Sequence, residues 1–138
     1  MDNIFSLEGK VVVLTGGYGN LGRSMSKALL DFGANLIVFD CVEKVPESLE
    51  RTVPIRCDLS NTESVREAFR EVYNHFGRLD ALVNNAAYGG GAGGVKVPYK
   101  VEEITDDNWN LGLDGTLGVT FRCSREAVLY LEKQFKLR

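Results

Sequence analysis

The chain has 138 residues, a net charge of −3 and 44% hydrophobic residues, which fits one globular domain covering residues 1–138. Its lysines and arginines are scattered, which argues against nucleic acid or an anionic membrane as a partner. No apolar stretch is long enough for a signal peptide or a membrane span. The three cysteines form no C-x-x-C pair, which argues against a disulfide framework or a zinc site and fits a reducing cytoplasm.

The first predicted elements alternate between strand and helix. Lys10–Thr15 is a β-branched run, typical of a strand buried on both faces. The glycine-rich turn Gly16–Gly22 follows, and apolar residues at helical spacing then predict a helix that ends at Gly33. Asn35–Asp40 is predicted to be the second strand.

The middle of the chain repeats this alternation. Residues 41–51 are polar and predict a loop or a short helix before a weaker strand, Val53–Asp58, whose proline suits a strand edge or start. Ser60–Glu63 has the pattern of a capping box, in which two side chains satisfy amides of the first helical turn. The helix behind it is expected to end at Gly77, and Ala81–Asn85 is expected to be the fourth strand.

The last third of the chain predicts one loop and one long helix. Gly89–Gly94 is glycine-rich and is expected to be mobile. Thr105, followed by two aspartates, can begin a helix that runs to about Lys136. Three interior glycines fall near one face of this helix, where a neighbour could pack closely: Gly112, Gly115 and Gly118.

This order of elements predicts an α/β fold with a parallel sheet, because parallel strands need crossover connections. With right-handed crossovers, the expected architecture is a Rossmann-type three-layer fold with strand order 3-2-1-4. That order corresponds to one half of a Rossmann fold plus the first strand beyond the point at which the strand order reverses. We therefore expect an incomplete domain whose later strands are missing.

The turn between the first strand and the first helix predicts a phosphate site. A helix N-terminus presents free amides and the positive end of its dipole to a pyrophosphate. In the G-x-x-G-x-x-G spacing, Gly16 permits the tight turn, Gly19 lets the backbone approach the phosphates, and Gly22 lets helix and strand pack closely. A flexible glycine turn with no ligand is the alternative.

Asp40, at the end of the second strand, strengthens this interpretation. A carboxylate there can accept hydrogen bonds from the adenosine ribose hydroxyls and repels a 2′-phosphate. Neither Cys41 and Val42 nor the loop residues Gly17 and Tyr18 supply a cation. The pattern favours NAD over NADP, with a solvated aspartate at a strand end as the alternative.

With these motifs in place, the chain resembles the short-chain dehydrogenase/reductase family. The resemblance rests on the glycine loop, on Asp58–Leu59, on Phe76–Ala87 with its Asn-Asn-Ala block, and on Trp109 before a long helix. It implies that Asp58 borders the adenine and that the Asn-Asn-Ala block shapes the cofactor site. The cofactor-binding residues predicted in this way are Gly16, Tyr18, Gly19, Asn20, Leu21, Gly22, Asp40, Asp58, Leu59, Asn84, Asn85 and Ala86.

The sequence departs from the family pattern in three places. Asn20 replaces the glycine of the commonest single-domain pattern, which keeps open a fragment of an extended-branch nucleotide-sugar epimerase or dehydratase. Thr116 stands where relatives carry the helix asparagine that supports a proton relay. The family's Tyr-x-x-x-Lys pair is absent, because no tyrosine is followed by lysine four residues later, so we assign no catalytic residue.

The leading hypothesis is the NAD-binding part of an oxidoreductase that moves a hydride between nicotinamide and an alcohol or carbonyl carbon. This chain alone is expected to be inactive. The alternative that is not an enzyme is a non-catalytic dinucleotide-binding or partner-recruiting module. The substrate of a full-length parent would be a small alcohol or carbonyl compound whose identity the sequence does not disclose.

Self-association is a further expectation. The fourth strand would have an unpaired apolar edge, which invites pairing with another chain. The resemblance also implies that the last helix lines a subunit interface, so its apolar side chains are either core or dimer contacts: Tyr130, Leu131 and Phe135. His75 is the one histidine and is expected to be solvated, so no metal site is predicted.

Overall fold

The computed structural model describes residues 4–88 and 100–136, and the predicted loop Gly89–Gly94 lies outside them. Strands and helices alternate through most of the chain, as predicted. The elements are β1 (Val11–Thr15), α1 (Asn20–Asp31), β2 (Asn35–Asp40), β3 (Val53–Arg56), α2 (Thr62–Phe76), β4 (Ala81–Val83), α3 (Asp106–Leu113) and α4 (Val119–Lys136), with short helical turns η1 (Glu47–Leu49), η2 (Val101–Glu103) and η3 (Asp114–Gly118).

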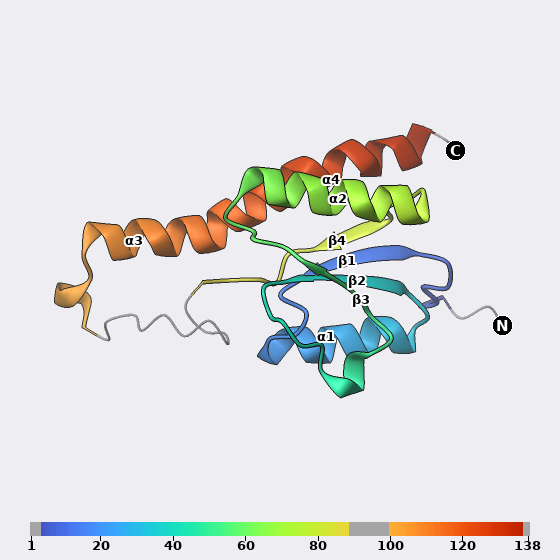
Figure 1. The fold of residues 1–138 in the computed structure, drawn as a ribbon, viewed down its shortest axis with the longest axis horizontal. Coiled ribbons are helices and arrows are strands. Elements are labelled where there is room, and N and C mark those ends of the chain that lie inside the picture. The colour runs from blue at the N-terminus through green and yellow to red at the C-terminus, as the bar shows by residue number, and fades with distance from the viewer. Residues whose placement is uncertain (1–3, 89–99, 137–138) are drawn as a thin grey trace.

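The four strands form one parallel sheet in the order β3-β2-β1-β4, which confirms the predicted topology. Figure 1 shows α1 on one face of the sheet and α2 with α4 on the other, so the fold has three layers. Because all strands run the same way, their carboxyl ends meet at one edge of the sheet. Residues that follow the strands are therefore brought together there.

Each face of the sheet has its own hydrophobic core, because successive side chains of a strand point to opposite faces. Val11 and Val13 pack with Phe69 of α2 and Cys123 of α4. The alternate residues of β1 pack on the other face, where Leu30 of α1 lies. This two-sided burial explains the continuous β-branched run of β1, all of which is buried.

The start of α2 differs from the prediction. Asn61, not Ser60, is the N-cap, and its Oδ1 accepts a hydrogen bond from the Ser64 amide at 2.9 Å. Ser60 instead donates its amide and its hydroxyl to Asp58 Oδ1. The capping-box prediction from Ser60–Glu63 is therefore wrong, because Ser60 forms its hydrogen bonds with Asp58 and Asn61 caps the helix. α2 ends at Gly77, as predicted, and the structure shows that this glycine has a left-handed backbone conformation.

β3 and β4 are shorter than predicted. β3 ends at Arg56, and β4 ends at Val83, beyond which the amides of Asn85 and Ala86 donate to Thr15 Oγ1. Within the residues that the structure describes, β4 pairs with β1 alone, and its three side chains are only partly buried.

The final helical region is continuous, but its middle is a wider, π-helical turn. α3, the π-helical turn η3 and α4 follow one another without a break, and Figure 1 shows α3 extending beyond the sheet. Of the three glycines, Gly115 meets the predicted close neighbour, since an added Cβ would lie 2.4 Å from Tyr88 Cβ. Gly112 has open space beside it. No helix in the described part of the chain is long and apolar enough to cross a membrane.

Candidate functional site

The glycine loop between β1 and α1 has the backbone geometry that a phosphate needs. Gly16 has a φ of +64°, which allows the chain to turn sharply as it leaves β1. Gly19 is the N-cap of α1 and has no side chain with which to cap it. The amides of the first helical turn are thus available to an anion, and the helix dipole favours one.

Gly22 is required by packing rather than by backbone conformation. A Cβ on this residue would lie 2.0 Å from the Gly16 carbonyl oxygen and 2.8 Å from Gly17 Cα. The loop therefore folds directly against the first turn of α1. An added Cβ at Gly19, by contrast, would make only an ordinary 3.4 Å contact with the Gly16 oxygen, so that glycine leaves an open approach to the loop.

Asp40 is tied to the glycine loop. Its Oδ2 accepts a hydrogen bond from the Tyr18 amide at 3.1 Å, and its Oδ1 accepts from the amides of Cys41 at 2.8 Å and Val42 at 3.3 Å. The carboxylate at the end of β2 is therefore held in a fixed position beside the predicted phosphate loop. An ionised acceptor in this place suits the hydroxyls of a ribose.

Tyr18 anchors the loop from the other side. Its ring is buried, and its hydroxyl lies 2.8 Å from Thr52 Oγ1, which donates to the Leu49 carbonyl at 2.7 Å. Burial, the main cause, raises the pKa of Tyr18, so the phenol stays protonated at neutral pH. One residue thus connects the glycine loop, Asp40 and the segment before β3.

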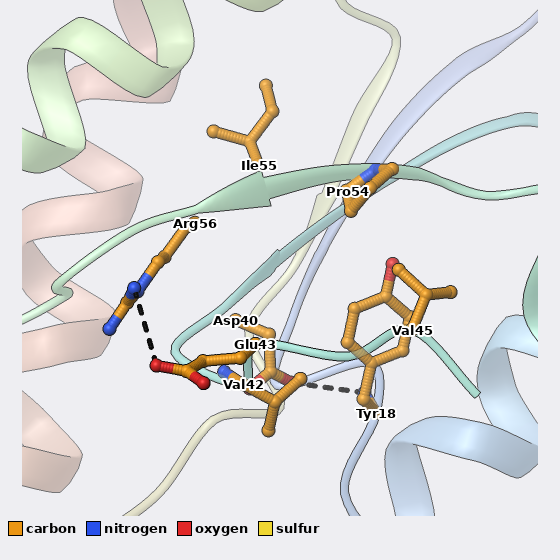
Figure 2. A pocket seen from close by; sticks show the side chains of 8 residues that line it. All are labelled: Tyr18, Asp40, Val42, Glu43, Val45, Pro54, Ile55 and Arg56. Atoms are coloured by element: carbon orange, nitrogen blue, oxygen red, sulfur yellow. Dashed lines mark hydrogen bonds and ion pairs between the residues drawn. The ribbon is translucent and has the colours of Figure 1, made fainter.

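A pocket opens between the ends of β2 and β3, and Tyr18 and Asp40 line it together with Arg56 and Glu43 (Figure 2). Arg56 is the register partner of Asp40 across the two strands, and its Nη1 lies 3.9 Å from Glu43 Oε1. This cation was missed in the sequence, where only Cys41 and Val42 and the loop residues Gly17 and Tyr18 were considered beside Asp40. The predicted strand order 3-2-1-4 was the signal that could have found it.

The Asn-Asn-Ala block is locked to the glycine loop through Thr15. The buried Thr15 Oγ1 accepts the amides of Asn85 and Ala86, each at 3.0 Å. The Asn85 side chain donates to the carbonyls of Thr15 at 3.1 Å and Gly16 at 3.0 Å. Thr15 is therefore a positioning residue, whereas the sequence had indicated it as the last residue of the first strand.

Asn84 lies differently from Asn85, although both were predicted at the cofactor. Its side chain donates to Ser124 Oγ of α4 at 3.0 Å. The structure therefore brings Asn85 and Ala86 to the glycine loop, while Asn84 links β4 to the last helix. Asn20 and Leu21 form the exposed first turn of α1, beside the loop.

Asp58 and Leu59 follow β3 at the same edge of the sheet. The hydrogen bond from the Ser60 hydroxyl, at 2.6 Å, is the main cause that lowers the pKa of Asp58, so this carboxylate is ionised at neutral pH. Arg122 of α4 donates to the Leu59 carbonyl at 3.3 Å and pairs with Asp114 of η3. Leu59 is thus linked directly to the last helix, while Asp58 is held by Ser60 and Ser64.

The remaining candidates do not gather into a reactive cluster. Thr116 lies exposed in η3, and His75 lies near the end of α2. No group of three or more metal-ligating side chains occurs in residues 4–88 and 100–136. The described site instead offers the uncapped N-terminus of α1 and the Asp40 carboxylate, groups whose chemistry suits an anion and hydroxyl donors.

Comparison with known proteins agrees with this geometry. The model of the family described as short chain dehydrogenase matches residues 10–136. The chain belongs to the short-chain dehydrogenase family. The match covers the glycine loop, Asp40, the Asn-Asn-Ala block and the last helix, which are the features of the predicted resemblance.

Curated members of the family include close relatives of this chain. L-fucose dehydrogenase from Bos taurus is 38% identical over 129 residues, which cover 91% of this chain and 46% of that protein. The 15-hydroxyprostaglandin dehydrogenase [NAD(+)] from Homo sapiens is 39% identical over 90 residues, or 58% of this chain and 34% of that protein. The chain therefore spans less than half the length of these relatives.

Two solved structures share this fold. The crystal structure of gox2181 superimposes with a TM-score of 0.79 at 28% identity, covering 94% of this chain and 51% of that one. The 3-ketoacyl-(acyl-carrier-protein) reductase from Brucella melitensis, solved in complex with NADH, gives a TM-score of 0.79 at 24% identity, covering 93% and 52%. At that identity the second likeness concerns the fold alone.

Proposed function

We propose that this chain is the NAD(H)-binding part of a short-chain dehydrogenase/reductase that transfers a hydride between nicotinamide and an alcohol or carbonyl carbon. The observation that carries the proposal is the fixed placement of the Asp40 carboxylate against the glycine loop, through the Tyr18 amide. Membership of the family and the NAD(+) in the name of one relative support it.

The residues present fit a dinucleotide. Gly19 leaves the approach to the α1 amides open, so the pyrophosphate would lie against that helix terminus. Asp40 would accept the adenosine ribose hydroxyls, and Asp58 and Leu59 would border the adenine. The nicotinamide supplies the carbon that gives or takes the hydride, and the protein's own task is to orient the cofactor.

Thr15 and Asn85 would hold the glycine loop and the segment after β4 in a fixed position relative to each other. Their four hydrogen bonds connect the end of β4 with the start of the glycine loop. The family resemblance implies that a Tyr-x-x-x-Lys pair carries out proton transfer, and these 138 residues contain no such pair. We therefore propose that this chain by itself binds cofactor without completing the reaction.

Asp40→Ala tests the cofactor preference. We expect the ratio of NAD to NADP affinity to fall at least about tenfold, because the variant loses ribose hydrogen bonds to a charged acceptor and the repulsion of a 2′-phosphate. Isothermal titration calorimetry of this chain with each dinucleotide measures the ratio. Asp31→Ala removes the same charge from an exposed site on α1 and should leave the ratio unchanged. An unaltered ratio in Asp40→Ala would remove this residue from the site.

Self-association is part of the same proposal. Large apolar side chains of the last helical region are exposed: Leu111, Leu113, Leu117 and Phe121. Exposed apolar side chains in such numbers are typical of a subunit interface, and the family resemblance points to this helix. We expect a mass above that of the monomer in light scattering at high micromolar concentration. A monomer throughout that range would contradict this part of the proposal.

The cysteines are the basis on which we propose a cellular compartment for this chain. All three are free, and Cys41 is exposed while Cys57 and Cys123 are buried. Free thiols are typical of a reducing compartment such as the cytoplasm.

A further inference from the structure

The pocket beside Asp40 contains a cation, Arg56, to which the proposed function gives no role. Arg56 lies on β3 directly opposite Asp40 in the parallel register. Figure 2 shows Arg56 and Glu43 reaching toward each other, with Asp40 and Tyr18 beside them. The pocket therefore holds two carboxylates and one guanidinium, and its local charge is negative.

We propose that Glu43 is a specificity-determining residue whose negative charge disfavours a 2′-phosphate at Arg56, both by pairing with this guanidinium and by repelling the phosphate. The proposal rests on the proposed function, since it assumes that adenosine binds at Asp40. It extends that function by assigning the preference for NAD to two acidic residues, Asp40 and Glu43. Asp40 meets the ribose, and Glu43 neutralises the cation on the neighbouring strand.

The geometry makes Arg56 a ready partner for a phosphate. A guanidinium binds phosphate through two parallel hydrogen bonds, and this one stands across from the carboxylate expected at the ribose. The Arg56 and Glu43 side chains are 71% and 83% exposed, and their atoms are 3.9 Å apart. Such a pair is weak, so Glu43 acts mainly through its charge, which both engages Arg56 and repels an incoming phosphate.

Glu43→Gln tests the proposal with two small probes that differ in the 2′-phosphate alone, 5′-AMP and 2′,5′-ADP. Calorimetry of the 138-residue chain gives the affinity for each. We expect the ratio of 2′,5′-ADP to 5′-AMP affinity to rise about fivefold, because one opposing charge is gone and Arg56 is released. The rise should shrink at high salt, since the charges involved are exposed.

Two further variants make the result specific. Glu47→Gln removes the same charge from an exposed residue of the same segment outside the pocket lining, and should leave the ratio unchanged. Glu43→Gln combined with Arg56→Gln should lose the gain, because the receiving cation is gone. All substituted side chains are exposed, so the fold should tolerate the changes, and thermal unfolding checks this.

The outcomes separate this inference from the proposed function. An unchanged ratio in Glu43→Gln, or a gain that persists in the double variant, overturns the role of Glu43 while binding of 5′-AMP still supports the site. Failure of the original chain to bind 5′-AMP, 2′,5′-ADP and NAD overturns the site itself, and the inference with it.

Discussion

Gly22→Ala should lower the free energy of unfolding by about 3 kcal/mol or more. The new Cβ would lie 2.0 Å from the Gly16 carbonyl oxygen, and the atoms it meets are backbone atoms that no side-chain rotation can move. Either the loop or the first turn of α1 must shift, and dinucleotide binding should be lost with the loop geometry. Urea unfolding followed by circular dichroism measures the change in stability.

Gly19→Ala is the matched control for this result. Its Cβ would make an ordinary 3.4 Å contact with the same oxygen, and the backbone φ of −73° accommodates alanine. We expect this variant to keep nearly the original stability but to bind dinucleotide more weakly, because the methyl group stands where the phosphate approaches. A Gly22→Ala variant as stable as Gly19→Ala would contradict the packing argument.

Thr15→Val is the second substitution with a large expected effect. Thr15 is fully buried, and its Oγ1 accepts the amides of Asn85 and Ala86. Valine keeps the shape of the side chain but offers no acceptor, so two partly buried amides lose their partner at once. An unsatisfied donor costs about 1–3 kcal/mol, and we expect a total loss of about 2–4 kcal/mol in chemical unfolding.

Thr15→Ser separates the acceptor from the methyl group. Serine keeps the oxygen and removes one buried carbon, so its cost should be about 1 kcal/mol. Hydrogen exchange adds a local measurement, since the amides of Asn85 and Ala86 should exchange faster in the valine variant than in the serine variant. Equal stabilities of the two variants would show that Thr15 Oγ1 does not support this junction.

Some of the fold was predictable because local patterns and chain connectivity specify it. The β-branched run of Lys10–Thr15 identified β1, and Gly77 marked the end of α2. Element ends were less accurate, because they depend on competition between partners. Ser60 was expected to cap α2 but bonds to Asp58, and Asn61 caps the helix instead.

The sequence by itself determined the parallel sheet order, the glycine loop and the family, because periodicity, crossover rules and motif spacing are properties of the chain. It also placed Asp40 at the end of a strand. Only the tertiary structure decided which groups meet there: Thr15 with Asn85, and Arg56 with Glu43 beside Asp40. Such contacts depend on the register between strands and on side-chain direction, and residues far apart in the chain carry no local signal of either.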